Sequence, residues 1–101
     1  RCIICNNSSN SGGGIAICHG TIINCLIRNN QASYGGGIQN CDGNILNCTI
    51  TQNTGEAVNG CDGQIINCIV WGNTPDTITN NTSAITYSCW PDGTSGTGNE
   101  W

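Results

Sequence analysis

The segment that decides the fold is NCLIRNN at residues 24–30, followed by GGGI at residues 35–38. Its pattern returns as NCTITQN at residues 47–53 and as NCIVWGN at residues 67–73. The opening residues 1–7, RCIICNN, fit the same pattern, so the steps between copies are 23, 23 and 20 residues. The chain is therefore an array of internal repeats of 20–23 residues.

Many positions recur with these steps. A single gap explains the shorter last step, because residues 31–34 correspond to Thr54 alone in the following repeat. The recurring columns hold cysteine, aliphatic residues, asparagine or glycine: Cys2, Cys25, Cys48 and Cys68; Cys18, Cys41 and Cys61; Ile4, Ile27, Ile50 and Val70; Ile15, Ile38 and Val58; Ile22, Ile45 and Ile65; Asn7, Asn30, Asn53 and Asn73; Gly20, Gly43 and Gly63. Because so many columns share one register, the alignment is secure.

Repeats of this length are too short for units of two helices, and they fit the coils of a β-solenoid. In a solenoid, equivalent residues stack about 4.8 Å apart, and the inward side chains of all coils join into one core. β-Branched Ile suits such inward columns. We predict an all-β parallel β-helix of about four coils, at residues 2–24, 25–47, 48–67 and 68–89. Residues 90–101 are expected to form a terminal extension or to start a further coil.

Within each coil we expect one strand around the IINCLI segment of residues 22–27 and its equivalents, and a shorter strand after the glycine run. Asparagine at turns tolerates a left-handed backbone, and stacked amides can hydrogen-bond along the axis. The column that begins at Asn7 therefore predicts an asparagine ladder. Solvated turn residues are the alternative interpretation of the same column.

The unit at residues 24–30, together with GGGI at 35–38, resembles the right-handed parallel β-helix repeats of bacterial surface proteins. It is similar in style to polymorphic outer-membrane-protein repeats, with their GGAI-like and Asn-ended motifs. The resemblance covers residues 1 to about 75, and residues 85–90 with 96–99 resemble the last coil of such proteins. It implies a solenoid that is extracellular or exposed on a cell surface. The right-handed sense comes from the family and from the rule for parallel crossovers.

The composition excludes several classes of protein. Lys and Arg number 2 among 101 residues and the net charge is −4, so the chain cannot neutralise a nucleic-acid backbone. No apolar run approaches the ~18 residues of a membrane span. The sequence contains no Met, so we expect that it starts after processing or is a segment of a longer chain.

The 9 cysteines allow three interpretations: disulfides, a metal site or ladders of buried thiols. Cys2 and Cys5 form one Cys-x-x-Cys pair without a second, so a structural zinc site lacks half its ligands. Stacked cysteines would keep their Cβ atoms about 4.8 Å apart, whereas a relaxed disulfide prefers about 3.8 Å. We therefore expect free thiols in both cysteine columns, with disulfides as the alternative.

Three further expectations concern single residues. An odd number of cysteines leaves at least one without an intrachain partner, and Cys5, in an outward column, is the candidate reactive thiol. Cys89 follows Cys68 by 21 residues and is expected to end the main cysteine column. Trp71 takes the outward position of Arg28 and is expected to pack against the C-terminal residues.

Pectin lyases and polygalacturonases also use β-helix folds, so catalysis is a possible function of this fold. Glycoside hydrolysis needs two carboxylates at a fixed separation, and β-elimination needs a basic residue with Ca²⁺. The chain has no Lys, and Arg28 and Asp42 fall on different faces of the coil. His19, Asp42 and Asp62 are expected to stack, which would place the two carboxylates about 5 Å apart along the axis. This pair is a weak Ca²⁺ candidate, and Asp-Gly turn chemistry is the alternative. We expect no enzyme and no cofactor.

Two functional classes remain. The first is a structural or adhesive surface solenoid whose open coil ends associate head to tail into a filament or stalk. The second is a fragment of a larger β-helix protein that binds or degrades polysaccharide. Trp71 and Trp90 could stack on sugars, so a surface polysaccharide is a candidate partner.

Overall fold

The structure is a computed structural model that describes residues 1–89. Every strand in these residues belongs to a parallel sheet, and they contain no helix. The strands are β1 (Ile3–Cys5), β2 (Ile15–Cys18), β3 (Ile22–Ile23), β4 (Leu26–Arg28), β5 (Ile38–Cys41), β6 (Ile45–Leu46), β7 (Thr49–Thr51), β8 (Val58–Cys61), β9 (Ile65–Ile66), β10 (Ile69–Trp71), β11 (Ile78–Thr79) and β12 (Ile85–Thr86). The expected extension at 90–101 lies outside the described residues.

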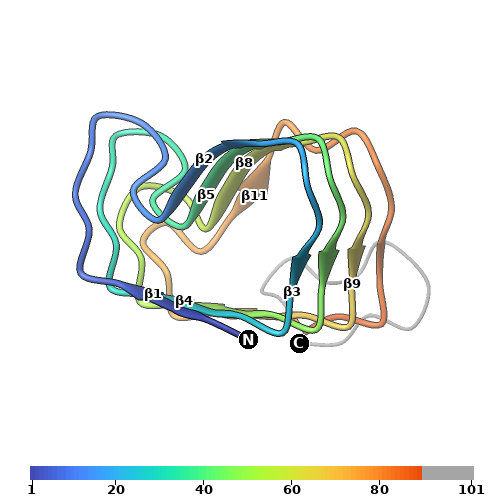
Figure 1. The fold of residues 1–101 in the computed structure, drawn as a ribbon. Coiled ribbons are helices and arrows are strands. Elements are labelled where there is room, and N and C mark those ends of the chain that lie inside the picture. The colour runs from blue at the N-terminus through green and yellow to red at the C-terminus, as the bar shows by residue number, and fades with distance from the viewer. Residues whose placement is uncertain (90–101) are drawn as a thin grey trace.

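The strands form three four-stranded sheets, ordered β1-β4-β7-β10, β2-β5-β8-β11 and β3-β6-β9-β12. Each coil contributes one strand to each sheet, so the sheets form three walls of the solenoid (Figure 1). From the N-terminal end in Figure 1, the chain runs clockwise as it recedes, which is the right-handed sense. Pairing follows the repeat alignment, as in Ile27 with Ile50. The predicted parallel β-solenoid of about four coils is confirmed.

The division of each coil into strands differs from the sequence prediction. Residues 22–27 form two strands, β3 and β4, because Asn24 between them has a left-handed backbone with φ of 55°. Asn47 and Asn67 make the same corner in the next coils, with φ of 54° and 55°. Asn adopts this conformation at a lower energetic cost than most residues, because its short polar side chain can hydrogen-bond locally. The strand after the glycine run was also wrongly expected to be the shorter one, since β2, β5 and β8 have 4 residues each.

The aliphatic columns form the core. Ile27, Ile50 and Val70 are completely buried, and so are Ile38 and Val58 in the second wall. Alternate residues in the same strands point outward, as the two-residue period of a strand requires. The core also holds buried cysteines, which act as small apolar side chains at the corners.

The asparagine ladder is confirmed. The side chain of Asn30 donates from Nδ2 to Ile4 O and to Asn53 Oδ1, both at 3.0 Å. Its Oδ1 accepts from the backbone and side chain of Asn7, at 3.1 and 3.0 Å. Asn53 repeats these bonds with Asn73. Both interior amides therefore satisfy their full hydrogen-bonding capacity while only 1% exposed, which explains why a polar residue is tolerated in the core.

Two residues change the pattern in the last coil. Asp76 ends the asparagine ladder, because its carboxylate accepts from Asn73 Nδ2 at 2.9 Å and from Gly72 N at 2.6 Å. Ser88, and not Cys89, follows Cys68 in the main cysteine column, since Ser88 Oγ accepts from Cys68 N at 3.1 Å. Cys89 instead pairs with Ile69. The prediction that Cys89 ends the column is wrong because this coil is 20 residues long and not 21.

Candidate functional site

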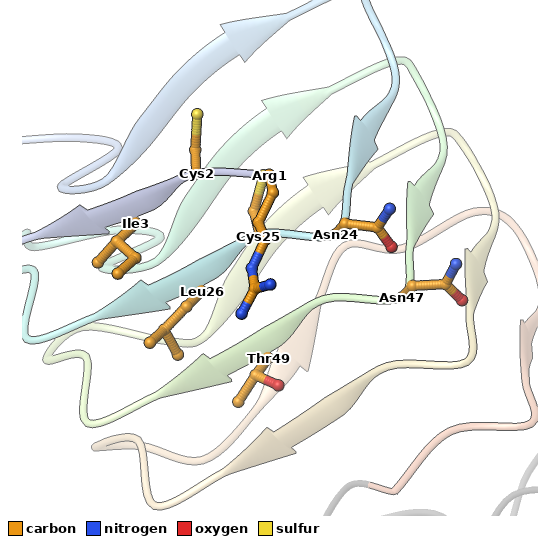
Figure 2. Close-up of a pocket in the computed structure, with 8 residues that line it drawn as sticks. All are labelled: Arg1, Cys2, Ile3, Asn24, Cys25, Leu26, Asn47 and Thr49. Atoms are coloured by element: carbon orange, nitrogen blue, oxygen red, sulfur yellow. The ribbon is translucent and has the colours of Figure 1, made fainter.

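Two hollows lie along the corner where the third wall turns into the first. The first corner hollow measures about 470 Å³ and is lined by Arg1, Cys2, Ile3, Asn24, Cys25, Leu26, Asn47 and Thr49 (Figure 2). The second corner hollow measures about 360 Å³ and is lined by Asn47, Cys48, Thr49, Asn67, Cys68, Ile69, Tyr87 and Cys89. Asn47 and Thr49 belong to both, so the hollows follow one another along the solenoid axis.

The rim of these hollows is a column of corner amides. Figure 2 shows the side chains of Asn24 and Asn47 in the same orientation, one coil apart. Asn67 continues the column and donates from Nδ2 to Asn47 Oδ1 at 2.8 Å. All three side chains are exposed. The sequence analysis missed this second asparagine ladder, although the recurrence of Asn before each column cysteine was a signal for it.

The main cysteine column runs along the same corner, and Figure 2 shows the side chains of Cys2 and Cys25 on the opposite side of the wall from those of Ile3, Leu26 and Thr49. Cys48 and Cys68 are each 1% exposed, whereas Cys2 is exposed and Cys25 is half-buried. The thiol of Cys48 donates to Leu46 O at 3.2 Å, and that of Cys68 donates to Ile66 O at 3.3 Å. Cys25 makes the same bond to Ile23 O, at 3.2 Å. The thiols of successive coils therefore share one orientation, as the predicted ladder requires.

The two buried thiols of this column have different acidities. A hydrogen bond from the neighbouring Cys68 thiol lowers the pKa of Cys48 to about 6, although burial acts in the opposite direction. The pKa of Cys68 is raised, first by its hydrogen bond with Cys48 and then by burial.

The second cysteine column lies at the end of the second wall. Cys18 pairs with Cys41, and Cys41 pairs with Cys61, in the strand register. Each thiol donates to the carbonyl two residues ahead, as Cys41 does to Gly43 O at 3.2 Å. Burial raises the pKa of Cys41 to about 12 and also raises the pKa of Cys61. These thiols stay protonated at neutral pH. All nine cysteines of the chain are free thiols in the structure.

The acidic candidates lie at the corner after the second wall. His19 Nδ1 lies 2.5 Å from Asp42 Oδ2, and both side chains are mostly exposed. Asp62 instead accepts from Thr82 Oγ1 at 2.8 Å. The structure thus gives each carboxylate a separate protein partner. A Ca²⁺ ion between Asp42 and Asp62 stays a hypothesis.

The outward face of the first wall carries the remaining predicted residues. Cys5 pairs with Arg28, and Trp71 pairs with Thr51, so the four form one outward column. Cys5 is half-buried, and the side chain of Asn6 donates to its sulfur at 3.6 Å. Trp71 is 47% exposed. The contact expected between Trp71 and the C-terminal residues falls on 90–101, outside the described residues.

Glu56 is a polar residue that the sequence analysis left unassigned. It stands in the third copy of the glycine run, with a left-handed φ of 45°. Its carboxylate accepts from Gly35 N at 3.1 Å, from Asn59 Nδ2 at 2.6 Å and from Thr79 Oγ1 at 3.2 Å. Glu56 therefore joins three coils where the chain is shortened, which gives it a structural role.

Within residues 1–89, no three His, Cys, Asp or Glu side chains converge in a way that could hold a metal ion. The same residues include no helix long and apolar enough to cross a membrane. No protein-family model, curated protein or solved structure significantly matches the chain.

Proposed function

We propose that this chain is a non-catalytic structural or adhesive β-solenoid of an extracellular or cell surface, of the kind its repeats resemble. Its role is to add coils end to end, in a filament or a surface stalk. The observation that supports the proposal is the uniform stacking of the coils, because each of the three sheets gains one parallel strand per coil in the same register. A further coil, from a second copy of the chain, can pair with the edge of this stack in the same way.

Among residues 1–89, the inward columns are less buried in the first coil than in the second. Ile4 and Ile15 are half-buried, whereas Ile27 and Ile38, one coil further, are fully buried. Asn7 is exposed and donates to Asn30, while each interior ladder residue also accepts from the coil before it. A second copy stacked on this end would bury the aliphatic side chains and extend the ladder. Such a head-to-tail contact does not close, so it grows into a filament.

Sedimentation velocity of the 101-residue chain over a concentration series, with electron microscopy, tests the proposal. The wild-type chain is expected to form larger species as concentration rises, and to appear as rods. Ile15→Lys places a charge in the contact and is expected to yield monomers. Ala16→Lys is the matched control, because Ala16 is exposed on the same strand β2 and its side chain points away from the core.

Two outcomes contradict end-to-end assembly. One is a wild-type chain that is folded and monomeric at high micromolar concentration. The other is equal assembly of the wild type and Ile15→Lys. Circular dichroism of each variant confirms that the β-solenoid has formed, so that loss of assembly is not loss of folding.

A second candidate function is binding of a polysaccharide, as part of a larger β-helix protein. It is favoured by the corner amides, of which Asn24 lines the first corner hollow, Asn67 the second and Asn47 both, and by Tyr87, which is 61% exposed beside the second. Amides hydrogen-bond sugar hydroxyls and a tyrosine ring can stack on a sugar face. A glycan array probed with the wild type and Tyr87→Ala tests this, and failure of the wild type to bind any glycan contradicts it.

A further inference from the structure

Tyr87 occupies a corner position where the other coils have asparagine. The backbone of Asn67 donates to Thr86 O at 3.1 Å, so Tyr87, the next residue, follows Asn67 in the column of corner residues. Its backbone is left-handed like theirs, with φ of 50°. Asparagine tolerates this conformation, whereas a bulky residue there is an outlier, and such outliers cluster at functional sites. Because Tyr87 is 61% exposed, packing of its ring in the core does not explain its presence.

The change from asparagine to tyrosine ends the ladder of corner amides. Asn67 Nδ2 donates to Asn47 Oδ1 at 2.8 Å, and an asparagine at residue 87 would donate to Asn67 Oδ1 in the same way. Tyr87 has no amide, and within residues 1–89 Asn67 Oδ1 accepts no hydrogen bond while Asn47 Nδ2 donates none. Both asparagine side chains are exposed. The corner therefore presents one acceptor and one amide donor to a molecule outside the chain.

These groups line the second corner hollow. The thiols of Cys48 and Cys68 are 1% exposed and belong to the core, so the open face of the hollow consists mainly of Asn47, Thr49, Asn67, Ile69 and Tyr87. Thr49 and Ile69 are paired in β7 and β10, and Ile69 is 51% exposed. The hollow thus combines an exposed aromatic ring, an apolar side chain, a hydroxyl and two amides. Sites for small molecules have this composition, with apolar and aromatic surface and a few polar groups that orient the ligand.

The chemistry of the hollow suits an uncharged sugar. The apolar face of a sugar ring can stack on tyrosine, and sugar hydroxyls can donate to Asn67 Oδ1 and accept from Asn47 Nδ2. The lining of this hollow, all of it within residues 1–89, includes no Asp, Glu, Lys, Arg or His, so it offers no partner to a charged ligand. A peptide that extends a sheet needs a strand edge, and β7 beneath the hollow has β4 and β10 on its two sides.

We propose that the second corner hollow binds one unit of a neutral saccharide, with the sugar ring stacked on Tyr87 and its hydroxyls hydrogen-bonded to Asn47 and Asn67. The proposal rests on the second candidate function, polysaccharide binding, and adds to it the class of sugar and the place where the sugar binds. It is independent of the proposed end-to-end assembly.

Tyr87→Asn separates binding from folding. This variant restores the residue that the other coils have at the corner, so the backbone conformation becomes easier to adopt while the ring is lost. Its melting temperature is expected to equal or exceed that of the wild type, whereas loss of a ring that served only folding would lower it. Tyr34→Asn is the matched control, because Tyr34 is also 61% exposed and does not line the hollow.

The experiment titrates the isotope-labelled 101-residue chain with cellotetraose, xylotetraose and mannotetraose as neutral probes, and with tetragalacturonic acid as an acidic probe. Two-dimensional NMR follows the side-chain amide signals of Asn47 and Asn67. At least one neutral probe is expected to shift both signals, and the acidic probe is expected to bind more weakly. Tyr87→Asn is expected to weaken the affinity about tenfold or more, whereas Tyr34→Asn binds as the wild type does.

The outcomes separate this site from the candidate function on which it rests. If a probe binds without shifting the two amide signals, or binds Tyr87→Asn as tightly as the wild type, the hollow is not the site, although polysaccharide binding stands. Tighter binding of the acidic probe overturns the neutral class of sugar. No binding of any probe overturns the site, and a glycan array on which the wild type also binds nothing overturns the candidate function as well. Circular dichroism verifies folding of each variant before titration.

Discussion

At the residue scale, the solenoid depends on which side of a short strand each side chain faces. Ile50 is completely buried between Ile27 and Val70, its partners in the neighbouring strands. Thr51, the next residue, is half-buried on the outward face. A single residue thus separates a core position from a surface position.

Ile50→Asp is expected to lower the free energy of unfolding by several kcal/mol, because a carboxylate without a partner enters the core. Thr51→Asp is expected to cost under about 0.5 kcal/mol, since that side chain stays in contact with water. Denaturant unfolding of both variants measures the difference. Equal losses at the two positions would show that the assigned register is incorrect.

Ile17 is an unusual residue for its backbone conformation. Its backbone is left-handed, with φ of 52°, and the equivalent residues of the later coils are Asn40, Gly60 and Asn80. Asparagine and glycine tolerate this conformation, whereas a β-branched residue is an outlier there. Ile17 is also 64% exposed, so packing against the core does not explain its presence.

Ile17→Asn is therefore expected to stabilise the monomer by about 1 kcal/mol, and Asn40→Ile to destabilise it by a similar amount. Thermal unfolding of the two variants at low concentration measures both effects. A stability loss in Ile17→Asn under these conditions would mean that Ile17 makes a contact in the monomer that outweighs its backbone strain.

At the element scale, the repeat alignment predicted the strand register, because equivalent residues of stacked coils must pair. The pairing of Ile38 with Val58 follows from the alignment alone. The division into strands could not be predicted in this way. The left-handed φ at Asn24 depends on the path of the corner, and the hydrophobic pattern continues through that corner without a break.

The candidate site was predicted only in part, for the same reason. The cysteine columns followed from the spacing of residues such as Cys48 and Cys68. The acidity difference between these two thiols depends on their mutual hydrogen bond, which spacing does not show. The sequence analysis assigned the last position of the column to Cys89 and not to Ser88, because Cys89 matches the other column residues and directly follows Ser88.

The glycine column shows how closely the coils approach at the corner after the second wall. A Cβ atom on Gly43 would collide with the carbonyl oxygen of Gly20, and one on Gly63 would collide with that of Gly43. A Cβ atom on Gly20 would meet nothing within 4 Å, since no described coil lies on its far side. The column is therefore needed for stacking wherever a coil precedes it.

Gly43→Ala is expected to destabilise the fold by a few kcal/mol, because the backbone of Gly20 must move. Gly20→Ala, the same change one coil earlier, is expected to have little effect on the monomer. Chemical denaturation at low protein concentration compares the two. A similar loss in both would indicate that the glycines are needed for their backbone conformation and not for close approach.

At the scale of the whole molecule, the two cysteine columns place several thiols in the core of a solenoid that has few charged residues. Burial raises the pKa of Cys41 to about 12, and the pKa of Cys61 and of Cys68 is raised as well. In the unfolded chain these thiols have ordinary values near 9.0. Folding therefore favours their protonated forms.

The sign of the pH dependence follows from proton binding. Above the ordinary thiol pKa the unfolded chain loses these protons while the folded chain keeps them, so stability falls as pH rises. Cys48 acts in the opposite direction, because its pKa is lowered to about 6 and its contribution is lost as pH falls through that value. Because three thiols have a raised pKa and one has a lowered pKa, the net effect is a loss of folding stability at alkaline pH.

The melting temperature of the reduced chain is therefore expected to fall steadily as pH rises from about 9 toward 12. Cys41→Ser is expected to flatten this fall, because a serine hydroxyl does not titrate in the range and keeps a donor for the carbonyl of Gly43. Thermal unfolding under a reducing agent, at matched ionic strength, measures both curves. Parallel curves for the wild type and Cys41→Ser would show that this thiol does not link folding to pH.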